Sequence, residues 1–173
     1  MLKPDFRWLC LLLLAQPVNA EVILAPLFQA GGVLQREKPI PVWGKADPGK
    51  EVTVAFAGQT KKATTAPNGR WQVALDPLPA SAEGRTLTVT EAGSAPKEIG
   101  DLLVGEVWLG SGQSNMEFVV AQTTPENQAI AAKGPVPLLR LFTVPKAISN
   151  TRLDTINSKW VNATPENASR FSA

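Results

Sequence analysis

Apolar and polar residues alternate strictly over much of the first half of this 173-residue chain. The alternation is clearest in the segments 51–58, 70–75 and 85–90. A period of two is typical of antiparallel strands with one buried face. Short strands at regular spacing predict a β-sandwich domain over residues 21–103. The residues expected to face its core are Val52, Val54, Phe56, Trp71, Val73, Leu75, Leu87 and Val89.

Turn-forming residues separate these expected strands. Asp47-Pro48-Gly49 precedes one strand, and Pro67-Asn68-Gly69 lies between two. Asn-Gly favours a β-hairpin because both residues tolerate positive φ. Trp43 and Trp71 are interpreted as core residues rather than as platforms for sugar rings, because large aromatic side chains in strands are usually buried.

The pattern changes after Asp101. Residues 102–109 form a nearly continuous apolar run, which is typical of a strand covered on both faces. A Gly/Ser-rich stretch, Gly110-Ser-Gly-Gln-Ser-Asn-Met116, follows directly. A buried strand that runs into such a turn and opens a helix would place a serine beside free backbone N–H groups. This is the geometry of a nucleophile turn, although a Ser flanked by Gly is more often only a turn.

Two further helix starts and a strand are expected after that turn. Thr124-Pro125-Glu126 predicts an N-cap, a proline at the first helical position and an acidic first turn, in a helix that runs to Lys133. Residues 138–144 predict a strand, and Thr164-Pro165-Glu166 repeats the helix-start signal. This order predicts the start of an α/β domain over residues 104–173, truncated because roughly 70 residues are too few to complete one.

The N-terminus predicts export. Lys3 and Arg7 form a short basic region before the apolar run 9–15, and Val18-Asn19-Ala20 has the small or β-branched residues of a cleavage site. Residues 1–20 are therefore interpreted as a signal peptide, and the protein is expected in the periplasm or the extracellular space with no membrane anchor after cleavage.

Composition narrows the function classes further. The single cysteine, Cys10, lies within the expected signal peptide, so the mature chain depends on its core rather than on disulfides. The formal net charge is +2 and no basic cluster is present, which argues against nucleic acid as a partner.

The string Val104-Gly-Glu-Val-Trp-Leu-Gly-Ser-Gly-Gln-Ser-Asn-Met-Glu117 resembles the nucleophile block of the sialate O-acetylesterases, a branch of the SGNH-type hydrolases. Val33-Leu-Gln-Arg36, Pro41-Val-Trp-Gly44 and Gly69-Arg-Trp71 resemble the N-terminal β-domain of that family. Trp160-Val-Asn-Ala-Thr-Pro-Glu166 resembles the segment before a family helix. The resemblance covers the N-terminal portion of the family only, and it implies a flavodoxin-like, SGNH hydrolase-like fold for the α/β part.

The resemblance implies the chemistry of a serine esterase. Ser114 corresponds to the nucleophile, and its own N–H would contribute to the oxyanion hole. Gln113 and Asn115 would shape or support the turn. The implied substrate is O-acetylated sialic acid or another acetylated sugar, and no metal or organic cofactor is implied. On spacing alone, Ser111 is a rival of Ser114.

One requirement of that chemistry is missing, because the chain has no histidine. A serine hydroxyl needs a base within hydrogen-bond reach, so the chain is expected to be inactive alone. Glu106, Glu117 and Asp154 are interpreted as structural or solvated carboxylates rather than as substitutes. Two other hypotheses remain open: a non-catalytic β-sandwich that binds sugar or serves as a scaffold, and a decayed product that does not accumulate.

Overall fold

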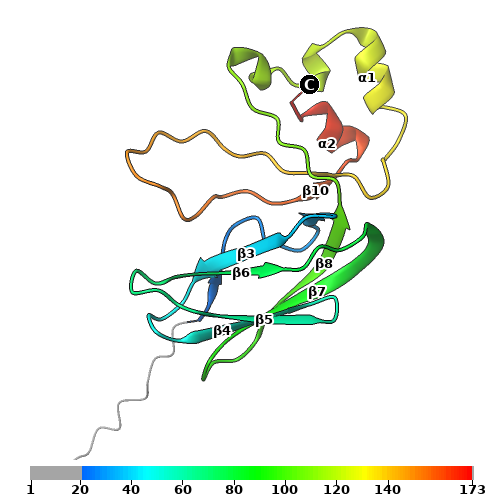
Figure 1. The fold of residues 1–173 in the computed structure, drawn as a ribbon. Coiled ribbons are helices and arrows are strands. Elements are labelled where there is room, and N and C mark those ends of the chain that lie inside the picture. Colours follow the sequence, from blue (N-terminus) through cyan, green and yellow to red (C-terminus); the bar gives the residue numbers. More distant parts are fainter. Residues whose placement is uncertain (1–20, 173) are drawn as a thin grey trace, which may run out of the picture.

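The computed structural model describes residues 21–172, so the expected signal peptide lies outside the described residues. Two sheets make up most of the molecule (Figure 1). The first, of three strands, has the order β1 (Ile23–Leu24), β3 (Ile40–Lys45), β6 (Arg70–Leu75). The second, of five strands, has the order β2 (Val33–Gln35), β8 (Lys97–Gly105), β7 (Ser81–Glu91), β4 (Glu51–Phe56), β5 (Gln59–Thr64). No helix in this described part is long and apolar enough to cross a membrane.

Side chains from both sheets meet in one hydrophobic core. The three alternating segments of the sequence became β4, β6 and the end of β7, and each turns its predicted apolar face inward. All eight predicted core residues are buried, with exposures between 0% and 5%. Burying one such aliphatic or aromatic side chain stabilises the fold by about 1.5–3 kcal/mol, so this face is the main source of stability.

Trp43 and Trp71 both belong to the core region, as predicted. Trp71 is only 3% exposed. Trp43 packs against the core, with its ring edge-on to Phe28 at a centroid distance of 4.9 Å.

The prediction of a hairpin at Asn68-Gly69 was wrong. That turn connects β5 of one sheet to β6 of the other, and of its two central residues only Gly69 has a positive φ. The tight hairpin lies instead between β4 and β5, where Ala57 and Gly58 have φ values of 50° and 79°. Two successive positive φ values match the right-handed twist of the flanking strands. Ala57 is an uncommon choice there, and this is why the sequence did not show the hairpin.

Strand β8 carries the apolar run that was expected to open the second domain. β8 pairs antiparallel with β7 and parallel with β2. The first part of the apolar run therefore belongs to the five-stranded sheet. Leu102, Leu103 and Val104 are all buried, which confirms a strand covered on both faces at this point. The strand ends at Gly105, and the rest of the run leaves the sheet; Trp108 is 90% exposed. β8 thus crosses the boundary predicted between residues 103 and 104.

Residues 106–172 contain short elements, which gather at the end of β8 (Figure 1). In order they are the 3-10 helices η1 (Ser114–Glu117) and η2 (Val120–Gln122), α1 (Pro125–Ala131), β9 (Arg140–Leu141), β10 (Val161–Asn162) and α2 (Pro165–Ser169). The expected strand 138–144 is reduced to two residues. It pairs antiparallel with β10, so no parallel α/β sheet forms within the described residues.

The two helix starts that the sequence predicted are confirmed. Thr124 is the N-cap of α1, with Pro125 in its first turn. Thr164 is the N-cap of α2, and its hydroxyl accepts a hydrogen bond of 3.3 Å from the backbone N–H of Asn167. A side-chain acceptor of this kind satisfies one of the free N–H groups of the first turn.

Substitution of Gly44 by alanine should destabilise the sheet. A Cβ on Gly44 would lie 1.9 Å from the carbonyl oxygen of Ile23, so β1 would have to leave β3. We expect a loss of about 1–3 kcal/mol in the free energy of unfolding, measured by urea titration. Gly100→Ala is the matched control, because a Cβ on that strand glycine meets nothing within 4 Å and its effect should stay within about 0.5 kcal/mol. Equal effects of the two substitutions would contradict this packing.

Candidate functional site

Ser114 lies on an exposed turn that follows the end of β8. The side chain of Met116 folds back over this turn: a Cβ on Gly112 would lie 2.7 Å from the Cγ of Met116, and one on Gly110 would lie 3.1 Å from its Cε. The two glycines therefore allow Met116 to lie against the backbone. This packing explains why a Gly/Ser-rich stretch precedes the serine.

The helix that opens at the serine is shorter than expected. η1 is a single 3-10 turn, with Gln113 at its N-cap and the carbonyl of Gln113 accepting a hydrogen bond of 2.9 Å from the N–H of Met116. Asn115 accepts a backbone hydrogen bond of 3.2 Å from Phe118. Gln113, Ser114 and Asn115 thus lie consecutively on one exposed turn, and their roles as site residues stay predictions.

The carboxylates considered from the sequence are all held in ion pairs. Glu117 pairs with Lys146, and Glu106 accepts a hydrogen bond of 2.6 Å from the Nε of Arg36. That hydrogen bond, together with one from Gln35, holds the pKa of the Glu106 carboxyl below its usual value. A carboxylate with a lowered pKa is a poor proton acceptor, which agrees with a structural role.

Asp154 lies between two cations of the three-stranded sheet. Its carboxylate contacts Lys45 at 2.6 Å and Arg70 at 2.5 Å, and these two residues are cross-strand neighbours on β3 and β6. Hydrogen bonds from Lys45 and then from Arg70 lower the pKa of the Asp154 carboxyl. Like charges opposite each other in a sheet repel, so Asp154 both relieves that repulsion and fastens the long loop 143–160 to the sheet.

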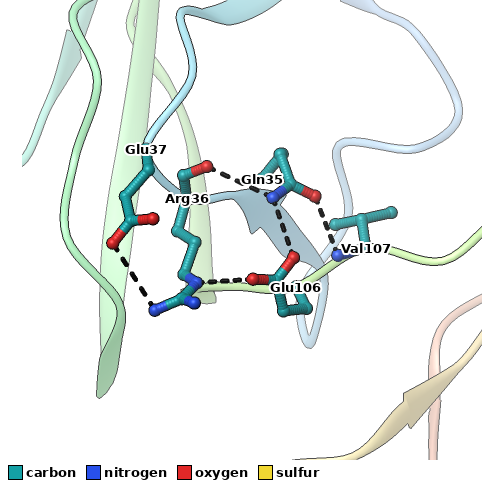
Figure 2. A network of polar contacts seen from close by, with 5 residues as sticks. All are labelled: Gln35, Arg36, Glu37, Glu106 and Val107. Atoms are coloured by element: carbon teal, nitrogen blue, oxygen red, sulfur yellow. Dashed lines mark hydrogen bonds and ion pairs between the residues drawn. The ribbon is translucent and has the colours of Figure 1, made fainter.

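A second polar network joins β2 to the segment that leaves β8, and the sequence did not show it. Figure 2 shows the side chains of Gln35, Arg36 and Glu106 in mutual contact beside the backbone of Val107. The residues belong to two strings that resembled the same family, but they lie about 70 positions apart in the chain. Only the parallel register of β2 and β8 brings them together.

An apolar hollow of about 530 Å³ lies between the end of β8 and the C-terminal segment. Leu103, Trp108, Phe142 and Trp160 are among the residues that line it, and Ser114 is not. The indole N–H of Trp160 donates a hydrogen bond of 2.9 Å to the carbonyl of Leu27. This bond joins the Trp160 side of the hollow to the turn that follows β1. Among the described residues, no cluster of three or more His, Cys, Asp or Glu side chains suits a metal ion.

Exposed apolar side chains are distributed very unevenly. Of the thirteen exposed large apolar residues in the described part of the chain, eleven lie between residues 107 and 153, and only Ile23 and Leu27 come before them. Trp108 and Leu109 are neighbours, and each is about 90% exposed, so both faces of this extended segment are apolar. Large exposed apolar patches mark surfaces that bind another protein segment, a membrane or a ligand.

Comparison with known proteins finds sialate O-acetylesterases among the relatives of this chain. No protein-family model matches the chain. The sialate O-acetylesterase of Mus musculus is 31% identical over 147 residues, which are 78% of this chain and 27% of that protein. The Homo sapiens sialate O-acetylesterase is 30% identical over 147 residues, or 78% of this chain and 28% of that protein. The chain is a homologue of the sialate O-acetylesterases.

A solved structure agrees with this relationship. A crystal structure of a carbohydrate acetylesterase from Xanthomonas citri matches this sialate O-acetylesterase homologue with a TM-score of 0.78 and 35% sequence identity. The match covers 88% of this chain and 35% of that one. The chain therefore spans about a quarter of the length of the curated esterases and about a third of the bacterial enzyme. The mainly β architecture is that of this part of a carbohydrate acetylesterase.

Substitution of Asp154 by asparagine should destabilise the homologue in a pH-dependent way. Because the pKa of Asp154 is lower in the folded than in the unfolded protein, its charge stabilises the fold above the usual aspartate pKa of about 4. This stabilisation is lost as the pH falls through the folded-state pKa. We expect a lower melting temperature of the variant at pH 7 and a difference that disappears in strong acid.

Asp76→Asn is the control for this measurement, because Asp76 forms a single, more exposed ion pair with Lys61. Its melting temperature should differ little from that of the unaltered protein. A constant difference between the Asp154 variant and the unaltered protein from pH 7 down to pH 2 would exclude the ionised carboxylate as the cause.

Proposed function

We propose that this chain supplies the nucleophile of a secreted carbohydrate O-acetylesterase and that Ser114 is that nucleophile. The observation that carries the proposal is the structural match to a carbohydrate acetylesterase at 35% identity, taken together with the Gly-Gln-Ser-Asn-Met turn exposed at the end of β8. A rigid sheet that ends in a loop is a common way to position a reactive side chain. The N-terminal sequence supports export to the periplasm or the outside medium.

The proposed reaction is acyl transfer in two steps. The Oγ of Ser114 attacks the acetyl carbonyl while a base takes the hydroxyl proton, and the sugar leaves as an alcohol after accepting a proton. Water then attacks the acetyl-serine and releases acetate. The N–H of Ser114, at the first position of η1, would donate to the oxyanion that forms in each step. Gln113 and Asn115 would hold the turn.

The described residues contain no side chain to which we assign the role of base. The sequence contains no histidine, and the three carboxylates considered above are already paired with cations. We therefore propose that residues 21–173 are inactive alone and that an SGNH-type α/β domain is completed by further polypeptide. The apolar surface between residues 107 and 153 supports this proposal, because such a completion would cover it.

The two sheets are proposed to act as a β-sandwich scaffold. Trp71 is buried and Trp43 packs against the core, so neither is a freely exposed platform for a sugar ring. This packing favours the scaffold over an independent sugar-binding module. The sugar itself, O-acetylated sialic acid or another acetylated sugar, remains a proposal made from the names of the relatives.

A chimeric enzyme tests the proposed nucleophile. The matched third of the Xanthomonas citri acetylesterase would be replaced by residues 21–173 of this chain, and hydrolysis of an acetylated sugar would be measured. We expect activity that Ser114→Ala lowers by about four orders of magnitude or more. Ser111→Ala is the matched control and should retain most of the activity. A folded chimera whose activity survives Ser114→Ala would disprove the assignment.

An assay of the isolated chain tests the proposal that the base is supplied by further polypeptide. Purified residues 21–173 should hydrolyse p-nitrophenyl acetate no faster than the Ser114→Ala variant, because an unassisted serine hydroxyl is a weak nucleophile at neutral pH. Initial rates at matched protein concentration are the measurement. A clear rate that depends on Ser114 would mean that a group other than histidine activates the serine, and the proposal of an external base would fail.

A further inference from the structure

The parallel pairing of β2 with β8 stops in an unusual way. The register pairs Gln35 with Gly105, and the N–H of Arg36 still donates a hydrogen bond of 2.9 Å to the carbonyl of Gly105. In a parallel ladder the next bond would join the N–H of Val107 to the carbonyl of Arg36. That bond is absent, because the chain leaves the sheet at this point.

The side-chain amide of Gln35 fills the gap. Its Oε1 accepts a hydrogen bond of 2.9 Å from the N–H of Val107, and its Nε2 donates one of 3.2 Å to the carbonyl of Arg36. One amide thus satisfies both backbone groups that the next rung would have joined. The two strands separate by the width of a side chain without leaving either group unpaired, as Figure 2 shows.

Glu106 fixes that amide in place. Its carboxylate accepts a hydrogen bond of 3.1 Å from the Nε2 of Gln35 and one of 2.6 Å from the Nε of Arg36. The guanidinium of Arg36 also lies 3.5 Å from the carboxylate of Glu37. Hydrogen bonds to charged groups are stronger than neutral ones, so the network defines the direction in which residues 106 and 107 leave the sheet.

We propose that Gln35 and Arg36, through Glu106, position the segment that carries Ser114. This proposal deepens the proposed function, on which it rests for the role of Ser114, by making the β2 strand a part of the nucleophile's support. Gln35 and Arg36 are positioning residues, since neither contacts the serine. Their effect is carried by the six residues between Val107 and Ser114, which have no strand or α-helix of their own.

Distances between spin labels test the proposal in the chain itself. The expected mature form has no cysteine, so Ser114→Cys and Glu98→Cys provide two unique labelling sites, the second on the exposed side of β8. We expect Gln35→Ala to broaden the distance distribution between the labels measurably. Gln59→Ala is the matched control, because the Gln59 amide also bridges a backbone N–H and a carbonyl, at the other edge of the sheet. That control should leave the distribution unchanged.

Amide hydrogen exchange gives a second readout. Loss of the Gln35 acceptor should make the Val107 amide exchange about five- to tenfold faster, as expected for one hydrogen bond. Amides in the β4–β7 pairing should keep their protection, which separates loss of positioning from loss of fold. The pair Gln35→Glu and Gln35→Glu/Glu106→Gln adds a rescue. The single change sets two carboxylates against each other, and the double change restores an amide–carboxylate pair whose carboxylate can accept from the Val107 N–H, although the carbonyl of Arg36 loses its donor. We therefore expect Val107 exchange to be slower in the double variant than in Gln35→Glu.

An unchanged label distribution and unchanged Val107 exchange in Gln35→Ala would overturn the proposal. So would equal effects of Gln35→Ala and Gln59→Ala. Neither readout depends on esterase chemistry, so the outcome is independent of the chimera experiment. If the positioning network is confirmed while Ser114→Ala leaves the chimera active, only the assignment of the nucleophile fails.

Discussion

Strand β8 is the element on which the rest of the structure depends, because apolar residues cover both of its faces. Leu102 and Val104 belong to the core shared by the two sheets, whereas Leu103, between them, points to the opposite face and lines the hollow beside the C-terminal segment. The same strand pairs with β7 on one side and with β2 on the other. It therefore joins the first part of the chain to the segment that follows, and the candidate serine lies just beyond its end. A polar substitution at Leu103 would act on the C-terminal segment more than on the core.

The parts of the fold that could be predicted from the sequence are those decided by nearby residues. Alternation within six residues was enough to predict β4 and β6 with the correct buried faces, because a strand has a side-chain period of two. Thr-Pro-Glu was enough for both helix starts, since capping is settled within one turn. The polar edge strand β5 was missed because its alternation, Gln-Thr-Lys-Lys-Ala-Thr, lacks large apolar residues. Its lysines suit an unpaired edge that must not pair with another chain.

The contacts that could not be predicted from the sequence are those that depend on how the strands pair with one another. Gln35 and Glu106 each lie beside residues that suggested a family, yet nothing in either string indicates that one side chain bonds the other. That contact follows from the parallel pairing of Val33 with Leu103, which a single sequence does not reveal. The same limit applies to Asp154, whose partners Lys45 and Arg70 come from two strands of another sheet. The candidate turn itself was recognisable because its glycines and its serine are consecutive, but the short length of η1 was not.

The position of the segment that carries Ser114 depends on the point at which this segment leaves the sheet. A nucleophile of the kind proposed here has to be held within a fraction of an ångström, and we propose that its support comes from the point where the segment leaves the sheet. Here that point combines a strand covered on both faces with a side-chain amide in place of the next backbone rung. Beyond it, Trp108 and Leu109 expose apolar faces that the first part of the chain does not cover. The sheet thus fixes where the segment begins, whereas the part of it that carries Trp108 and Leu109 has no such support among the described residues.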